Sequence, residues 1–242
     1  MTNVFILTYR GIDYFDQWFD PSNYDGTTNF YIVDNGSQVF PGRLEYMKVC
    51  ATTRNIGCAG GINLLSHIAF DYMGLDKIIV GQDDGKFTQQ MLDDTWNNIS
   101  PDVFVGGYNR SFEFALFGLH RDLYREVGDL DENFIFGGCE DNDYKHRMKL
   151  AGKQLIQMNF DANLNCSLSA KLESDVLEVS GKYNAAYIQM KWGVNYEYVH
   201  PFNDPTLNKD NILIQQGIRD VYGDVEEYPS RSEYRDYVND SI

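Results

Sequence analysis

Short apolar runs alternate along this chain with longer segments of helical periodicity, and this alternation constrains the fold more than any other feature. Apolar runs that predict strands occupy residues 3–10, 29–37, 44–52, 76–85, 102–109, 112–124 and 153–160. Helical patterns occupy residues 12–19, 55–75, 87–99 and 137–153. Strands that alternate with helices indicate an α/β fold with a single, mainly parallel mixed sheet flanked by helices.

The apolar rhythm weakens from about residue 167 onward, where Tyr, Asn and Asp become more frequent. We therefore expect one domain over residues 1–166, with its first half at about 1–100 and its second half at about 101–166. We expect residues 167–242 to be a C-terminal extension that packs on this domain and ends in a polar, mobile tail.

Composition and charge narrow the function. The chain has 242 residues, 43% of them hydrophobic, so it can bury a sizeable core. Its formal net charge of −16 repels phosphate backbones, which disfavours nucleic acids and anionic membranes as partners. No apolar run is long enough to span a bilayer. The four cysteines lack zinc-binding spacing and predict reduced thiols, hence a cytoplasmic protein.

Polar clusters follow three of the predicted strands, at residues 8–10, 34–37 and 83–84. Parallel sheets bind ligands at the carboxyl ends of their strands, so these clusters are expected to converge on one crevice. Asp83 and Asp84 are adjacent carboxylates, which could hold a divalent cation that neutralises a diphosphate. A solvated Asp-Asp-Gly turn is the alternative, and the local pattern alone favours the turn.

The segment TRNIGCAGGIN, residues 53–63, predicts a Gly-rich loop that enters a helix. Its glycines would allow a ligand close to the backbone, the helix start would offer N–H groups to an anion, and Arg54 would add a cation. The alternative is a connector whose glycines only make the turn. The spacing matches neither a P-loop nor a dinucleotide-binding fingerprint.

The segment GGCEDNDYKHRMKLAG, residues 137–152, predicts a helix that begins with acids and ends at Gly152. Glu140 or Asp141 could serve as a general base, although acids at a helix start are common and the local pattern favours this plain interpretation. Asp143 and Arg147 are four residues apart and are expected to pair. Among the histidines, only His200 is a candidate for a metal or substrate contact.

Five segments that end predicted strands or begin predicted helices follow one another along the chain: VFILTYR, FYIVDNGS, TRNIGCAGGIN, IIVGQDD and VGDLDENFIFGGCEDNDYKHRMKLAG. This succession resembles the family-two glycosyltransferases with the GT-A fold, especially the rhamnosyltransferase-like branch, over residues 3–165. The resemblance implies a GT-A fold with a Rossmann-like sheet. It also implies a hexosyltransferase that moves a sugar from a UDP- or dTDP-sugar to an acceptor hydroxyl, with inversion and with Mn²⁺ or Mg²⁺.

The resemblance also assigns roles to single residues. It implies that Asp141 is the catalytic base, with Glu140 beside it, and that Asp84 is the direct metal ligand, supported by Asp83. The residues expected to bind the nucleotide sugar are Thr8, Tyr9, Arg10, Asp34, Asn35, Arg54, Asn55, Gly60, Gln82, Asp83 and Lys191.

The sequence departs from the family pattern at the metal. Gln82 stands where the family has its first acid, and the segment after the acidic helix, where many relatives supply a histidine ligand, has none. His200 would then complete the site.

Two other functions remain open: a nucleotidyltransferase that makes a sugar nucleotide, and a non-catalytic glycan-binding domain. The acceptor of a transferase could be a glycan, a protein or a small molecule, and the sequence leaves the oligomeric state open.

Overall fold

The computed structural model describes residues 1–9, 19–36, 47–52, 55–83, 85–106, 114–158 and 174–193. The strands within these ranges are β1 (Thr2–Thr8), β2 (Thr28–Asp34), β3 (Met47–Ala51), β4 (Lys77–Gln82), β5 (Val103–Gly106), β6 (Leu116–His120) and β7 (Gln154–Gln157). The α-helices are α2 (Gly57–His67), α3 (Gln89–Asn98), α4 (Arg121–Val127), α5 (Glu140–Leu150) and α7 (Ser174–Trp192). A 3₁₀ turn covers Pro21–Asn23, and a π-helical turn at Ile68–Tyr72 continues α2.

The described strands form one sheet in the order β3-β2-β1-β4-β6-β5-β7. Strands β1 to β4 are parallel, β6 runs antiparallel to both β4 and β5, and β7 is parallel to β5. The predicted α/β fold with a single, mainly parallel mixed sheet flanked by helices is therefore confirmed.

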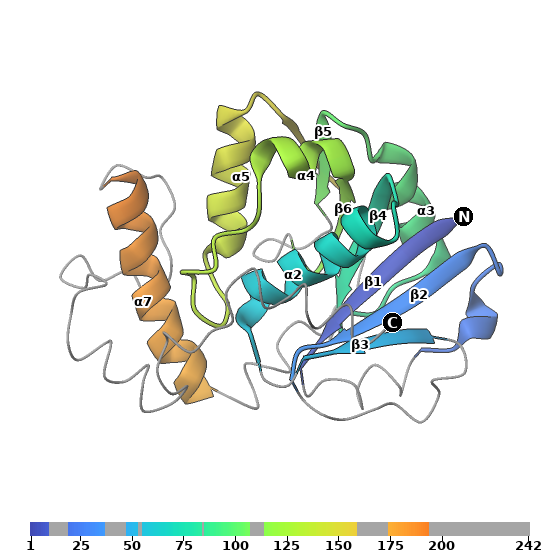
Figure 1. Cartoon of the computed structure of the whole chain (residues 1–242), viewed down its shortest axis with the longest axis horizontal. Coiled ribbons are helices and arrows are strands. Elements are labelled where there is room, and N and C mark those ends of the chain that lie inside the picture. Colours follow the sequence, from blue (N-terminus) through green and yellow to red (C-terminus); the bar gives the residue numbers. More distant parts are fainter. Residues whose placement is uncertain are drawn as a thin grey trace.

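Helices cover both faces of this sheet (Figure 1). Because side chains alternate along a strand, Phe5 and Leu7 of β1 pack on one face, with residues of α2, α4 and α5. Val4 and Ile6 pack on the other face, with Met91 and Leu92 of α3. Since β1 is buried along its whole length, it lies at the centre of the core. Its carboxyl end therefore opens at the middle of the sheet edge.

Gly61 lets α2 lie close to β1. A Cβ atom at this position would come within 2.6 Å of Leu7 Cδ1 and 2.9 Å of Leu7 Cδ2. We expect Gly61→Ala to lower the free energy of unfolding by about 1–3 kcal/mol, because the added methyl overpacks a filled contact. Urea denaturation checks this. Since Leu7 is the clashing partner, Gly61→Ala combined with Leu7→Ala should cost less than the sum of the two single variants.

Two helices were not predicted correctly from the sequence. Residues 121–124 belong to α4 rather than to a strand, because the His120 side chain accepts a hydrogen bond from Asp122 N (3.1 Å) and so caps a new helix. Helix α7 forms within the segment predicted as an extension without a regular pattern. Two of its buried residues, Ser180 and Asn184, are polar, so its inner face lacks the apolar period that reveals a helix.

The helix predicted at residues 12–19 lies outside the described residues, apart from Phe19. Helix α2 stops before Gly74, whose φ is +68°, and α5 stops before Gly152, whose φ is +69°, as predicted. Within the described ranges, every helix is too short or too polar to cross a lipid bilayer.

Candidate functional site

The carboxyl ends of β1, β2 and β4 meet at one edge of the sheet. Thr8 pairs with Asp34 across β1 and β2, and Leu7 pairs with Gln82 across β1 and β4. Asp83 Oδ2 accepts hydrogen bonds from Thr8 Oγ1 (2.5 Å) and from Tyr9 N (3.0 Å). The predicted convergence of the three strand ends is therefore confirmed for the described residues, while Arg10 and Asp84 lie outside them.

Asn35 and Asn55 hold the loop that precedes α2. Asn35 donates from Nδ2 to Asn55 Oδ1 (3.0 Å) and to the Gly57 carbonyl (2.9 Å), and its Oδ1 accepts from Ile56 N (2.9 Å). Asn55 Oδ1 also accepts from Gly57 N (2.8 Å). Since these bonds use both ends of the Asn35 amide and the oxygen of the Asn55 amide, the geometry shows a structural role for both side chains. Contact of either residue with a nucleotide stays a prediction.

The N-terminus of α2 is bonded to the protein itself. Cys58 N donates to the Phe136 carbonyl (2.6 Å), and Gly57, with φ of +80°, lies against the Phe136 backbone, which is 3.4 Å from the place of a Cβ atom. The glycines were predicted to allow a ligand close to the backbone. At Gly57 and Gly61, it is another part of the protein, Phe136 and Leu7, that approaches the backbone closely. Gly60 is buried within the first turn. Its part in ligand binding stays a prediction, and Arg54 lies outside the described residues.

Glu140 and Asp141 begin α5 with different environments. Glu140 is buried, with 6% of its surface exposed, and its Oε2 has no hydrogen-bond partner among the described residues. Burial, together with the negative charge of Asp141, raises the pKa of the Glu140 carboxyl. Asp141 is partly exposed, and its Oδ1 accepts from Asn142 N (2.8 Å) and Nδ2 (2.9 Å). Of these two carboxylates, Asp141 is therefore the one accessible from solution.

Cys58 connects the acidic helix start to the end of β4. Gln82 Nε2 lies 4.0 Å from Cys58 Sγ, and the Cys58 side chain is close enough to Glu140 to oppose the rise in the pKa of that carboxyl. The strand end and the acidic helix start, more than fifty residues apart in the chain, thus share one neighbour. Nothing in the sequence marked Cys58 as a site residue, because a cysteine in a Gly-rich segment carries no pattern of its own.

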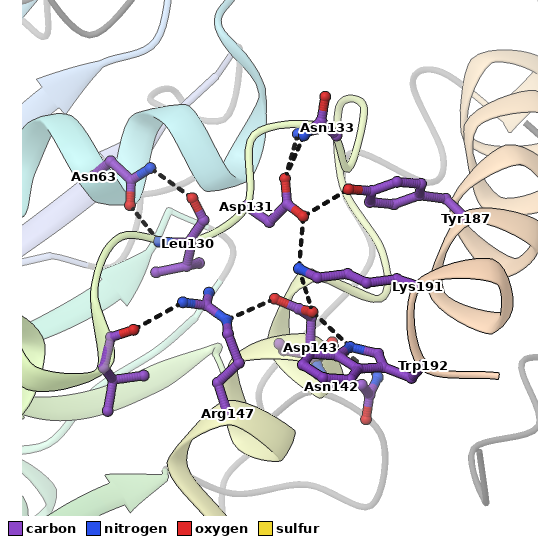
Figure 2. Close-up of polar contacts among 12 residues, drawn as sticks. Asn63, Leu130, Asp131, Asn133, Asn142, Asp143, Arg147, Tyr187, Lys191 and Trp192 are labelled. Carbon is purple, nitrogen blue, oxygen red and sulfur yellow. Dashed lines mark hydrogen bonds and ion pairs between the residues drawn. The ribbon is translucent and has the colours of Figure 1, made fainter. Parts of the chain in front are cut away.

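Lys191 lies in a cluster of charges between α7 and α5 (Figure 2). Its Nζ contacts Asp131 Oδ2 at 2.6 Å and Asp143 Oδ1 at 2.7 Å. Asp143 Oδ2 accepts from Arg147 Nε (2.9 Å), which confirms the predicted pair within α5. Two carboxylates therefore neutralise the Lys191 charge, and its predicted contact with a diphosphate has no support from these bonds.

The predicted metal ligands are only partly described. Asp83 Oδ2 is engaged with the end of β1, which suits a supporting carboxylate rather than a sole ligand. The described ranges contain no group of three or more His, Cys, Asp or Glu side chains arranged to hold a metal ion. Asp84 and His200, the other two candidates, lie outside these ranges, so a cation site at the end of β4 stays a prediction.

Comparisons with known proteins give structural likeness without sequence likeness. No protein-family model matches the sequence, and no curated protein matches it. One similar structure is a putative glucose-1-phosphate thymidylyltransferase from Bacillus anthracis in complex with sucrose, with a TM-score of 0.46 and 10% identity over 67% of this chain and 88% of that one.

Another similar structure is GalNAc-T7 with UDP, GalNAc and Mn²⁺, with a TM-score of 0.42 and 11% identity. That similarity covers 74% of this chain and 48% of GalNAc-T7. Likeness at these levels assigns neither a reaction nor a ligand to this chain.

Proposed function

We propose that this protein is a glycosyltransferase with a GT-A fold, which moves a sugar from a nucleotide diphosphate donor to an acceptor hydroxyl with inversion. One observation carries the proposal: the ends of β1, β2 and β4 meet at the sheet edge where Cys58 contacts both Gln82 and Glu140. Polar strand ends with an acidic helix start beside them would offer a donor site and a base in one place. The order of the sequence segments that resemble family-two glycosyltransferases supports the same conclusion.

Asp141 would take the proton from the acceptor hydroxyl as the oxygen attacks the anomeric carbon. Its partial exposure suits this role, because an acceptor must reach the base from solution. Glu140 precedes it at the helix start and is buried, so it would lie beside the base without meeting the acceptor. The end of β1, held by Asp83, would line the donor pocket with Thr8 and Tyr9.

A net charge of −16 opposes binding of a diphosphate unless cations lie close to it. Asp84, with Asp83 in support, would hold a divalent cation that neutralises the departing diphosphate. In the sequence, Arg10 comes shortly after the end of β1, and Arg54 comes shortly before the start of α2. Each would add a positive charge near the same strand ends. Metal dependence is thus part of the proposal and is tested with it.

A thermal-shift screen of nucleotide sugars, with and without Mn²⁺, tests the donor class and the metal together. A donor at one hundred times its Kd should stabilise the folded state by about 2.7 kcal/mol. For a chain of this size, this raises Tm by about 5–10 °C. We expect the shift with a UDP- or dTDP-sugar plus Mn²⁺, and a smaller shift when EDTA replaces the metal.

Three outcomes would separate the alternatives. Sugar transfer from the stabilising donor supports the proposal. Release of pyrophosphate from a nucleoside triphosphate and a sugar phosphate would identify a nucleotidyltransferase instead. Stabilisation by glycans, with none by any nucleotide sugar, would identify a glycan-binding domain and contradict the proposal.

A further inference from the structure

The loop that joins α4 to α5 has a strained backbone just before the acidic helix start. Phe136 and Cys139 have φ of 61° and 72°, in the left-handed region that costs free energy for a residue with a Cβ atom. Gly138 between them has φ of 103°. Contacts from outside the loop must hold this conformation, and the loop leads directly into Glu140.

Asn184 of α7 supplies such contacts. Its Oδ1 accepts a hydrogen bond from Ile135 N (2.9 Å), and its Nδ2 donates to the carbonyls of Ile135 (2.9 Å) and Gly137 (3.0 Å). Asn184 is completely buried, so water cannot replace these bonds without opening the structure. The three bonds hold Ile135 and Gly137, the residues on either side of Phe136. The carbonyl and the ring of Phe136 contact other parts of the structure.

Phe136 contacts the candidate site from between these bonds. Its carbonyl accepts from Cys58 N (2.6 Å) at the start of α2. Its ring lies edge-on to the ring of Tyr9, with the ring centroids 5.8 Å apart. A displacement of this loop would therefore disturb the contact of Phe136 with Tyr9 at the end of β1 and its contact with Cys58 in α2. It would also move the start of α5.

Helix α7 is docked on the loop and on α5 by other contacts as well. Ile188 packs with Phe134 and Cys139, and all three side chains are buried. Figure 2 shows Lys191 between Asp131 and Asp143, with Trp192 beside them. Trp192 Nε1 donates to Asp143 Oδ1 (2.8 Å). These contacts fix the position of α7. The hydrogen bonds of Asn184 then fix the loop relative to α7.

The opposite side of the same loop is held by α2. Asn63, also buried, donates from Nδ2 to the Leu130 carbonyl (3.0 Å) and accepts from Leu130 N (2.8 Å). Asn63 thus anchors the beginning of the loop, and Asn184 anchors its end. Asn184 bonds the part of the loop that is closer to the acidic helix start, since its partner Gly137 is three residues before Glu140.

We propose that Asn184 is a positioning residue of the site, which acts from α7 through residues 135–137 to place Glu140 and Asp141 against the ends of β1 and β4. The inference rests on the proposed glycosyl transfer. It makes α7 a part of the site, although the sequence pattern assigned this segment to an appended extension. Asn184 itself would touch neither the donor nor the acceptor, and would act through the loop.

Two variants of Asn184 and one control test the proposal in the full-length protein. Asn184→Ala removes all three hydrogen bonds. Asn184→Asp keeps the side-chain shape and the acceptor for Ile135 N, but it cannot donate to the two carbonyls, so it remains usable if the alanine variant fails to fold. Tyr187→Phe is the control on the same helix, because it removes the hydroxyl that hydrogen-bonds Asp131 (2.8 Å) and leaves the three Asn184 bonds in place.

The first measurement is the rate at which iodoacetamide alkylates Cys139, followed residue by residue with mass spectrometry. Cys139 is 1% exposed, and burial raises the pKa of its thiol, so the wild-type residue should react slowly. We expect Asn184→Ala and Asn184→Asp to speed this reaction several-fold, and Tyr187→Phe to leave it near the wild-type rate. This measurement needs no substrate.

The second measurement separates kcat from the KM of the donor. A small displacement of the base should lower kcat by about 10²-fold in the Asn184 variants. The donor KM should rise by a smaller factor than kcat falls, because Tyr9 loses one ring contact while Thr8 and Tyr9 keep their hydrogen bonds to Asp83. Tyr187→Phe should keep both constants, which excludes a general effect of destabilising α7.

The outcomes of the two measurements are distinct. If the alkylation rate of Cys139 does not change in either Asn184 variant, Asn184 does not hold the loop and the proposal is wrong. If the rate rises while kcat is kept, the loop is released without effect on catalysis, and the positioning role is wrong although the proposed function stands. If the wild type transfers no sugar from any donor, the proposed function fails, and the alkylation rate still decides whether Asn184 holds the loop.

Discussion

Asp141→Asn should lower the rate of sugar transfer by about 10²- to 10⁴-fold, the usual contribution of a positioned general base. The amide keeps the shape of the side chain but cannot accept the acceptor proton. Asp141 Oδ1 already accepts two hydrogen bonds from Asn142, so the substitution alters the helix start only locally. Donor binding, measured by thermal shift, should stay close to that of the wild type.

Two companion variants sharpen this result. Asp122→Asn changes another acid in the first turn of a helix, at the start of α4, and should leave the transfer rate unchanged. Glu140→Gln should have a smaller effect than Asp141→Asn, because Glu140 is buried away from an acceptor. A larger loss in Glu140→Gln than in Asp141→Asn would exchange the roles of the two carboxylates, and near-normal turnover in Asp141→Asn would show that Asp141 is not the base.

Lys191→Met should lower the free energy of unfolding by about 3 kcal/mol, since removing one partner leaves buried carboxylates short of positive charge. Asp143 is completely buried and Asp131 has 14% of its side chain exposed. Arg147 still pairs with Asp143 after the substitution, which keeps the loss at the lower end of the range for buried pairs. Thermal unfolding should show a Tm lower by about 6–12 °C.

Lys153 provides the matched control for Lys191. Its Nζ also bridges two carboxylates, Asp102 at 2.9 Å and Glu126 at 2.7 Å, but these carboxylates are 77% and 55% exposed. Water and salt already screen them, so Lys153→Met should change the stability little. Added salt should remove the remaining effect of Lys153→Met and leave most of the effect of Lys191→Met. Equal effects of the two variants would show that burial does not govern this cluster.

Much of the central sheet was predictable because local patterns and burial agree there. The run from Val4 to Leu7 is apolar without interruption, which is what a strand buried on both faces requires. The first two acids of α5 and Gly152 after it mark the two ends of a helix by chemistry that acts within a few residues. The strand ends could likewise be placed together, since parallel strands share one edge.

Helix α7 and the loop before α5 could not be predicted in this way. The inner face of α7 includes Asn184, a residue whose burial makes sense only with Ile135 and Gly137 as partners. The left-handed conformation of Phe136 and Cys139 goes against the preference of both residue types, so no local rule indicates it. Contacts between distant segments overrode local propensity in both places.

The sequence by itself determined the α/β class, the central parallel strands and the polar residues that end them, because each depends on periodicity or on turn chemistry over a short stretch. Only the tertiary structure decided that Asp83 is bonded to Thr8, that Glu140 is buried while Asp141 is accessible, and that Lys191 is neutralised between Asp131 and Asp143. These features depend on burial and on partners about forty to eighty residues away, which no window of sequence contains.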